Sequence, residues 1–589
     1  MQAAAVIGRR FDAELLQAVA EADPAGPLDT AAALDLVHRD QKSGSYFFKH
    51  ALVRDALYES LLTAPRAALH LKVAEEVGRR SGNRIEEVVQ VLAHHYARTK
   101  LADKAFFYLS AAGRKSLEAY SLDEADRQFR QALCLVDSDP RCASAHAVAD
   151  TVSFLLQVIL LKGNNYELTR VADRYMPMLE AMGDTPQIAL ALYFYCLVLA
   201  NKCDFRTAEA LAKRNLEIAG RLGDPRARAY ARTADLYVSS ILARYSLEEA
   251  KRMGTELIAD CNIARDGYIL NWAHFAVAFD HMNRGLMSDA RNWAWRLMAD
   301  GRERDDRRAI GMAHWLLCWI NIVDARYEGA LANAEESFRT AISPVDRNAA
   351  LAGSATASVL LGHATDGLAQ LEEVKRWTAE TDFLYLERAM TGGIAAAYVL
   401  TERLKEGIAL LERVIDASDK NGDRGNAWWN RVFLAEIYIE ILVSQQQVAL
   451  GVLLKNFGVL LRGKLFWRAS RQSIVGGSGP GAAASRSGHL AGTHQYGPWP
   501  LAQDNETTWP GAPISREGAW TGRAAGRGFD GQQNRRRVGR TPRLGPARGP
   551  FDLRDNVVCF ESWPCKTAFP REVGEKQGPG SVSGQDRRH

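Results

Sequence analysis

One unit of about 40 residues recurs along most of this chain, from about residue 100 to residue 465. In its clearest copy, Tyr245–Ala264, small or apolar residues at offsets of 0, 3, 7, 10, 11 and 14 form one face of an α-helix: Leu247, Ala250, Gly254, Leu257, Ile258 and Cys261. The same offsets recur at Leu122, Ala125, Phe129, Ala132, Leu133 and Val136. The residues that anchor successive copies lie 37 to 44 positions apart: Ala125, Thr169, Ala208, Ala250, Ala290, Ala330, Gly367, Gly407 and Ala449.

The ends of these helices carry their own signals. Ser246 and Glu249 have the spacing of a capping box, in which each side chain bonds the backbone N–H of the other residue. Ser121 and Glu124 repeat that spacing. At the other end, the Gly-Asp pairs that begin at Gly183, Gly223 and Gly422 are in phase, and glycine suits a left-handed helix terminus. The unit therefore consists of two helices and two turns.

A single helical hairpin cannot remove its apolar face from water, so neighbouring copies must stack. The partner helix also has an apolar face, formed by Tyr230, Ala234, Tyr237 and Ile241. About nine copies predict an all-α protein, a right-handed α-solenoid of tetratricopeptide-like hairpins over residues 99–465, with Leu247, Leu257 and Ile258 buried between neighbours. The step exceeds the roughly 34 residues of the standard tetratricopeptide repeat, so we expect longer helices.

Residues 1–98 do not follow the repeat. The pattern predicts helices over Phe11–Ala20 and Leu28–Val37, a polar turn, a short aromatic strand ending at Phe48, and a third helix over Lys49–Leu62. That order is the outline of a small winged-helix-like domain, followed by connecting helices.

The periodic pattern stops near Phe466, and residues 466–589 are rich in Gly, Pro, Arg and Ser. Five tryptophans, which are unusual in a linker, also lie there: Trp467, Trp499, Trp509, Trp520 and Trp563. This mixture favours a disordered tail read out of frame, and a basic disordered interaction segment is the alternative. Asn505-Glu506-Thr507 matches a glycosylation sequon, but a cytoplasmic protein would not meet the transferase.

Composition narrows the class of function. A formal net charge of +4 does not favour a nucleic-acid-binding protein, and the eight cysteines lack metal-ligand spacing. The longest apolar run, Phe154–Leu161, is shorter than the roughly 20 residues that span a bilayer, and the N-terminus lacks a signal-peptide core. We expect a cytoplasmic protein without membrane or nucleic-acid partners, cofactors or a metal site.

Four stretches carry a family resemblance: AVIGRRF over residues 5–11, FFKHALVRDALYESLL over residues 47–62, Leu69-His70, and LAHHY over residues 92–96. They resemble bacterial multidomain signalling ATPases, in particular the part that follows the ATPase in proteins with a class III adenylate/guanylate cyclase domain. Related ATP-dependent transcription activators share the same middle region. The resemblance implies a winged helix and tetratricopeptide-like repeats in which the repeats sense a protein partner or small-molecule signal.

The catalytic parts of that family are not recognisable in this chain. Gly113-Arg114-Lys115-Ser116 has the end of a phosphate-loop motif but a helical, apolar-periodic context, and no phosphate loop or pair of metal-binding aspartates is found elsewhere. The sequence therefore predicts a non-catalytic regulatory module that corresponds to the C-terminal portion of a longer protein. A transcription-regulator fragment and an inactive truncated product are the alternatives. DNA binding is disfavoured because the third helix offers only Arg54 against Asp55 and Glu59.

Few single residues are candidates for a site. The resemblance implies that His50 could sense the phosphates of a bound nucleotide, although a histidine that simply starts or packs a helix is the more frequent case. His94 and His95 point about 100° apart on a helix and are expected to be structural. Seven tryptophans could line a concave ligand groove, although packing between hairpins is the favoured interpretation: Trp272, Trp293, Trp295, Trp315, Trp319, Trp428 and Trp429.

Overall fold

The structure of the protein, a computed structural model, describes residues 1–443, with side chains described as far as Tyr438. The predicted tail over residues 466–589 and the repeat anchored at Ala449 lie outside the described residues. Within residues 100–443 every regular element is a helix, so the predicted all-α solenoid is confirmed for the described part of the array.

A three-stranded antiparallel sheet organises the N-terminal region. Its elements are α1 (Gln2–Ile7), β1 (Arg10–Phe11), α2 (Ala13–Ala20), α3 (Ala25–Ala33), β2 (Val37–Arg39), β3 (Tyr46–Phe48) and α4 (Ala51–Glu59). The strand order is β1-β3-β2, in which Phe11 pairs with Tyr46 and Val37 pairs with Phe48. The helix expected over Leu28–Val37 begins earlier and ends at Ala33, because Asp35 adopts a positive φ and Val37 joins the sheet.

Connecting helices follow this sheet region. They are α5 (Thr63–Ser81), the short 3-10 helix η1 (Gly82–Arg84) and α6 (Ile85–Tyr96). The helix expected over Lys49–Leu62 is therefore the shorter α4, and a new helix starts at Thr63 after an extended Leu62.

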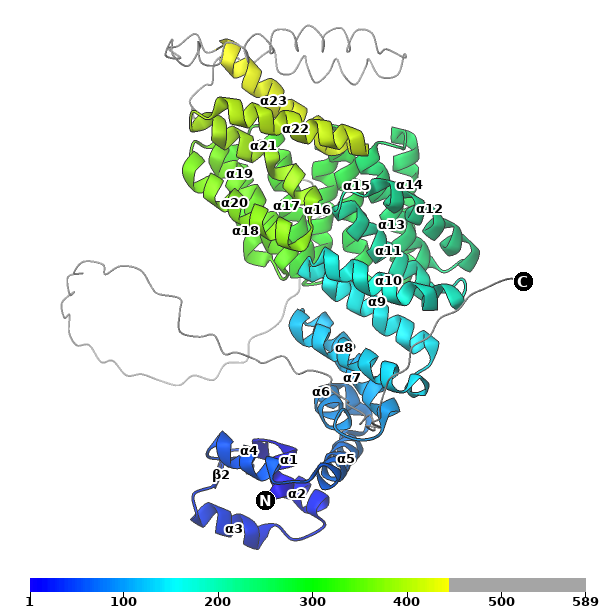
Figure 1. The fold of residues 1–589 in the computed structure, drawn as a ribbon, viewed down its shortest axis with the longest axis vertical. Helices are drawn as coiled ribbons and strands as arrows, with labels where there is room; N and C mark the ends of the chain where they lie inside the picture. Colours follow the sequence, from blue (N-terminus) through cyan, green and yellow to red (C-terminus); the bar gives the residue numbers. More distant parts are fainter. Residues whose placement is uncertain (444–589) are drawn as a thin grey trace, which may run out of the picture. The chain divides into compact units, whose positions relative to one another are not determined.

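Eight helical pairs and one further helix make up the described array (Figure 1). The odd-numbered members are α7 (Ala102–Glu118), α9 (Ala145–Lys162), α11 (Pro186–Asn201), α13 (Pro225–Leu242), α15 (Gly267–Asn283), α17 (Arg307–Val323), α19 (Pro344–Leu360), α21 (Leu384–Leu400) and α23 (Arg424–Val443). The even-numbered members are α8 (Leu122–Ser138), α10 (Asn165–Ala181), α12 (Phe205–Leu222), α14 (Leu247–Ala264), α16 (Met287–Glu303), α18 (Tyr327–Thr340), α20 (Ala364–Thr381) and α22 (Leu404–Asn421). A second short 3-10 helix, η2 (Pro140–Cys142), joins α8 to α9.

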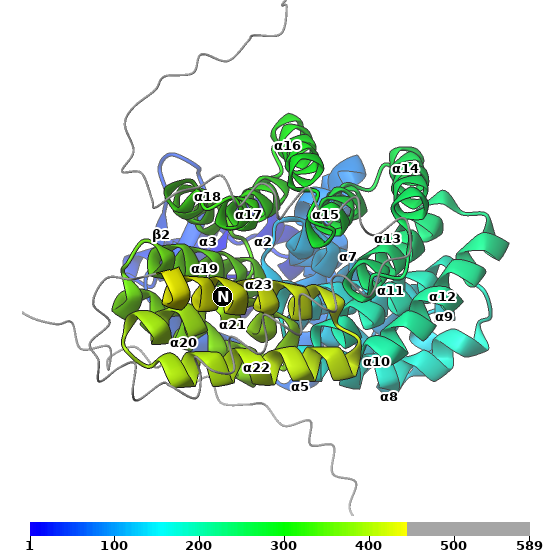
Figure 2. The ribbon, with the colours of Figure 1, turned by 90° about the horizontal axis from the view of Figure 1, so that it is seen from above.

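The two helices of each pair have different environments. Helix α11 buries thirteen of its sixteen residues, whereas α12 buries six of eighteen along a single face. Viewed from above, the even-numbered helices α10, α12, α14, α16, α20 and α22 lie along the outside, with the odd-numbered helices inside them (Figure 2). The apolar face predicted on α13 is fully inside, since Tyr230, Ala234 and Ile241 are all at most 2% exposed.

The small residues that anchor the repeat lie where an even-numbered helix crosses its partner. A Cβ added at Gly367 would stand 2.8 Å from the backbone oxygen of Ala355 in α19, and one at Gly407 would stand 2.8 Å from that of Ala395 in α21. Six of the eight described anchors are alanine or threonine, and Ala208, Ala290 and Ala330 are completely buried. The recurrent small residue thus permits close approach of the two helices.

The helix-end predictions are confirmed with one correction. Gly183, Gly223 and Gly422 adopt left-handed φ values of 75°, 67° and 74°, and Ser246 and Glu249 form both bonds of the capping box. Ser121 makes no capping bond, because the carboxylate of Glu124 binds Arg127 and Gln128 instead. Leu257 is completely buried, whereas Leu247 and Ile258 are only partly buried.

Helices ten positions apart in the array also touch. Helix α9 packs on α19, α11 on α21 and α13 on α23. At Gly163, at the end of α9, an added Cβ would stand 2.6 Å from the Trp377 ring of α20. The Lys202 ammonium lies 3.1 Å from the Asp382 carboxylate, and Asn165 donates a 3.2 Å hydrogen bond to the Asp382 carbonyl. The array therefore curls until one turn meets the next.

Candidate functional site

The curled array holds a partly open cavity between its inner helices. The water-accessible volume of the cavity is about 150 Å³. Its wall combines residues of α9, α11, α13 and α15 with residues of α17, α19, α21 and α23, and it includes Ser337 of α18. The residues that define it most are Tyr237, Trp272, Phe275, Phe279, Arg308, Trp315, Trp319, Asp346, Tyr385 and Trp429.

Aromatic rings form a continuous lining on this wall. The Trp272 and Phe275 rings meet edge to face with centroids 5.4 Å apart, and Phe275 stacks on Phe279 at 5.7 Å. Phe275 also contacts Trp315 at 5.5 Å, and Trp315 contacts Trp319 at 6.0 Å. Helix α15 presents this face because residues 272, 275, 279 and 282 lie on one side of a helix.

A single arginine interrupts the apolar lining. Arg308 has a side chain only 4% exposed, and its Nε lies 3.3 Å from the Asp346 carboxylate. Its guanidinium carbon is 5.6 Å from the centre of the Trp272 ring. Burial opposes the charge of Arg308, but the Asp346 carboxylate outweighs it and raises the pKa, so the cation is retained.

The Arg308 guanidinium is incompletely bonded. Its Nη1 is buried and has no hydrogen-bond partner among the described residues. Trp315 donates its Nε1–H to the Ala349 carbonyl at 3.2 Å, and Trp429 donates to Asn283 at 3.4 Å, whereas the buried Nε1 atoms of Trp272 and Trp319 also lack a partner among the described residues. A buried donor left without an acceptor costs roughly 1 to 3 kcal/mol, so Arg308 would be stabilised by an acceptor that reached its Nη1.

The tryptophans singled out in the sequence separate into two groups. Trp272, Trp315, Trp319 and Trp429 line the cavity while also packing against the core. Trp293 instead packs against His274 with centroids 5.7 Å apart, and Trp295 is 50% exposed. Trp428 meets Trp429 edge to face and does not belong to the cavity wall. Trp272, Trp315, Trp319 and Trp429 therefore both line the cavity and pack between helices, so both interpretations of the sequence apply to them.

The histidines of the N-terminal region lie far along the chain from this cavity. His50 is the exposed N-cap residue of α4, and its side chain makes no capping bond. His70 and His95 are buried, and a hydrogen bond of 2.8 Å connects their Nδ1 atoms. The Tyr58 hydroxyl lies 2.9 Å from Nε2 of His70. Burial, together with neighbouring positive charge, lowers the pKa of both His70 and His95 to about 3.

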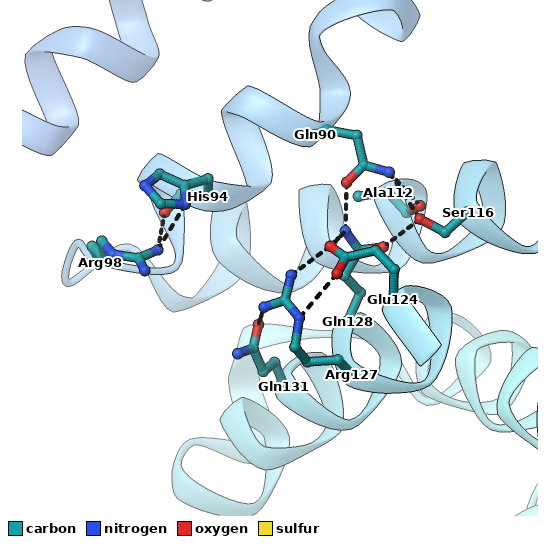
Figure 3. A network of polar contacts seen from close by, with 9 residues as sticks. All are labelled: Gln90, His94, Arg98, Ala112, Ser116, Glu124, Arg127, Gln128 and Gln131. Atoms are coloured by element: carbon teal, nitrogen blue, oxygen red, sulfur yellow. Dashed lines mark hydrogen bonds and ion pairs between the residues drawn. The ribbon is translucent and has the colours of Figure 1, made fainter. Parts of the chain in front are cut away.

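A second polar cluster joins α6 to the first helical pair (Figure 3). Gln90 of α6 donates to the Ala112 carbonyl at 3.1 Å and to Ser116 of α7 at 2.9 Å, and it also accepts from Gln128 of α8. Gln128 in turn donates to Glu124 at 2.7 Å. We call Gln90, Ser116, Glu124 and Gln128 the junction cluster. It fixes α6 to the repeat array through two buried side chains, Ser116 and Gln128, and two partly buried ones, Gln90 and Glu124.

Other sequence features have structural roles. Gly113 lies inside α7, where an added Cβ would stand 2.5 Å from the Phe129 ring. Among the described helices, α9 alone has the length and hydropathy to cross a membrane, but 61% of its residues are buried in the protein, as in a core helix. No group of three or more His, Cys, Asp or Glu side chains in residues 1–443 is placed to hold a metal ion. Cys261 is buried, as the apolar pattern predicts.

No protein-family model matches the chain, and comparison with curated proteins gives no match. Among solved structures, a signal transduction ATPase with numerous domains (STAND) from Pyrococcus horikoshii with a tetratricopeptide repeat sensor is 14% identical over 79% of this chain, with a TM-score of 0.35. This chain spans 64% of that protein. A Rap protein complexed with competence and sporulation factor is 13% identical over 62% of this chain and 94% of its own, with a TM-score of 0.44.

The tetratricopeptide repeat domain of P58(IPK) is also similar, at 15% identity over 57% of this chain and 98% of its own, with a TM-score of 0.18. Identities of 13 to 15% with TM-scores below 0.5 leave function to be argued from the residues of this chain.

Proposed function

We propose that this chain is the sensory and regulatory part of a signalling ATPase of the cyclase-coupled type, without a catalytic step of its own. The observation that carries the proposal is the cavity with an unpartnered buried donor on its wall residue Arg308, since the wall is assembled from both turns of the curled array. A ligand that fills such a cavity binds one curvature of the array better than another, and this differential affinity is what shifts a conformational equilibrium. The alternatives remain a transcription-regulator fragment and an inactive truncated product.

The N-terminal region has features that suit a transmitting domain. The order helix, strand, two helices and two strands, with sheet order β1-β3-β2, supports a winged helix. Helix α3 contains no lysine or arginine, and Arg54 of α4 is paired with Asp55. These helices therefore offer little positive charge for DNA phosphates, which favours a protein contact over a DNA contact. His50 is exposed at the start of α4, so its side chain is accessible to another domain.

A contiguous set of contacts connects the cavity with that region. Leu160 and Leu161 of α9 line the cavity, and α9 packs on α8. Helix α8 carries Gln128 of the junction cluster, which holds α6. Helix α6 carries His95, which bonds His70 of α5, and His70 bonds Tyr58 of α4. Contiguity alone does not demonstrate coupling, so a perturbation at one end must be read at the other.

The test fills the cavity without needing its natural ligand. Ala389 of α21 lines the cavity, so Ala389→Phe places a ring inside it. We expect hydrogen exchange in α5 to α8 to change in this variant, because the altered curvature is passed through α9. Ala259→Phe, at an exposed position of α14, is the matched control and should leave α5 to α8 unchanged. Changes confined to α9–α23 in Ala389→Phe would contradict the proposal.

A further inference from the structure

The cavity wall has a chemistry that restricts its ligand. Among all the residues that line it, Arg308 and Asp346 alone are charged, and most of the others are aromatic or aliphatic. Asp346 is already engaged by Nε of Arg308, whereas Nη1 of Arg308 is buried without a partner. The wall thus combines an apolar, largely aromatic surface with one cation, whose buried Nη1 becomes a donor to a ligand once the Arg308 side chain shifts toward it.

The volume restricts the size of the ligand. An empty apolar cavity of about 150 Å³ is known to hold one benzene molecule. The volume here is likewise about 150 Å³. Binding pockets for drug-sized molecules begin at about 300 Å³, so the part of a ligand held inside this cavity is smaller than such a molecule. A body of one ring is the size that the volume matches.

The charge of the ligand follows from Arg308. A cation would gain from the faces of Trp272 and Trp315, but it would also meet the fixed positive charge of Arg308 in a site of low dielectric. A neutral ring offers Nη1 no acceptor or, as in an alcohol, only an uncharged one. A carboxylate supplies that acceptor through a charge-assisted hydrogen bond, which is about twice as strong as a neutral one.

From this geometry we infer that the cavity binds a small carboxylic acid with a single aromatic ring or a body of similar size, held by its carboxylate on Arg308 and by its ring among Trp272, Phe275 and Phe279. The inference rests on the proposed sensory function and names the chemical class of its signal. The aromatic lining contributes affinity through burial of apolar surface, and the guanidinium distinguishes acids from isosteric neutral molecules.

Binding is measured with three probes of similar ring size, namely benzoate, benzyl alcohol and benzyltrimethylammonium, by calorimetry and by tryptophan fluorescence of the full chain. Tryptophan emission should report binding because four indoles line the cavity. We expect benzoate to bind at least tenfold more tightly than benzyl alcohol, and benzyltrimethylammonium to bind more weakly than either. Equal or tighter binding of the neutral or cationic probe would overturn the inference, as would the absence of benzoate binding.

Variants of the charged pair sharpen the test. Asp346→Asn removes the competing negative charge and should tighten benzoate binding several-fold. The double variant Arg308→Met with Asp346→Asn leaves no unpaired charge in the cavity, so it should fold, and it should bind benzoate no better than benzyl alcohol. Arg296→Met, in outer helix α16, is the control and should bind as the unmodified chain does. Retention of the preference for benzoate in the double variant would overturn the assignment of Arg308.

The outcomes separate this inference from the proposed function. If benzoate binds through Arg308 but Ala389→Phe leaves the N-terminal helices unchanged, the ligand class stands and the regulatory role fails. If Ala389→Phe alters those helices and benzoate does not bind, the regulatory role stands and the ligand class fails.

Discussion

At the scale of single residues, burial decides the behaviour of several ionisable groups in this chain. His70 and His95 are 1% and 2% exposed and share one hydrogen bond, so at most one proton lies between their Nδ1 atoms. The neutral pair can also satisfy the Tyr58 hydroxyl, because Nε2 of His70 is within 2.9 Å of it. Protonation of either ring would place a positive charge in a buried site that already faces Arg98.

This pair predicts a pH dependence of the N-terminal helices. The folded-state pKa of both His70 and His95 is lowered to about 3, from an unfolded value of about 6.5. The unfolded state therefore binds more protons between these values, and stability is full above pH 6.5 and falls as the pH drops toward 3. The loss is at most about 1.4 kcal/mol per pH unit for each histidine.

Pulse proteolysis of α5 and α6 in urea, at pH 7 and at pH 5, checks this prediction. Replacing both histidines by leucine should reduce the difference between the two pH values, whatever the variant's stability at pH 7, and the remainder belongs to His94 of α6, because burial lowers the pKa of His94 to about 4. His146→Gln, at an exposed position of α9, should retain the full difference. An unchanged pH dependence in the double leucine variant would refute the role of the pair.

At the scale of helices, the repeat depends on how closely an outer helix approaches its inner partner. Alanine is favoured over glycine inside a helix by about 1 kcal/mol. Gly367 and Gly407 therefore lower the stability of their helices unless the space between the two helices is too small for a Cβ atom. At Gly367 an added Cβ would meet Val359 at 2.5 Å and the backbone oxygen of Ala355 at 2.8 Å. Backbone atoms cannot move aside as a flexible side chain can.

We therefore predict opposite effects for the same substitution at two positions. Gly367→Ala should lower the free energy of unfolding by about 1 to 3 kcal/mol, because overpacking outweighs the gain in helix propensity. Gly220→Ala in α12 should raise it by about 0.5 to 1 kcal/mol, since nothing lies within 4 Å of the added Cβ. Urea unfolding of the two variants tests the pair. If both substitutions raised the free energy of unfolding, helix propensity alone would govern these two sites.

The sequence predicts this level of structure well because its signals are local. The 40-residue step, the buried face of α13 and the left-handed glycines all follow from spacing and backbone geometry. The turns within the pairs were not foreseen: Tyr120, Cys203, Ala325 and Glu402 adopt positive φ values, although none is glycine. Ser121 also escaped prediction, because the spacing of a capping box cannot reveal that the Glu124 carboxylate binds Gln128 and Arg127 farther along the same helix.

At the scale of the molecule, the curvature of the array creates the site. Four of the seven tryptophans marked in the sequence line the cavity, but Phe275, Phe279, Tyr385 and Arg308 were not identified. The apolar spacing of residues 272, 275, 279 and 282 was an available signal for α15. No such signal was available for the approach of α21 to α11 and of α23 to α13. This approach results from a small rotation at each repeat, which leaves the periodicity of the sequence unchanged.

The central claim is that the array closes on itself after ten helices and so forms the cavity. An open solenoid contacts only its neighbouring repeats, whereas here Lys202 of one turn lies 3.1 Å from Asp382 of the next. Zero-length carbodiimide crosslinking, followed by mass spectrometry of the peptides, measures this contact directly. The nearby pair of Lys162 and Asp126, 3.2 Å apart and of similar exposure, is the internal control. We predict crosslinked peptides for both pairs, and an efficient Lys162–Asp126 crosslink without any Lys202–Asp382 crosslink would contradict the closed array.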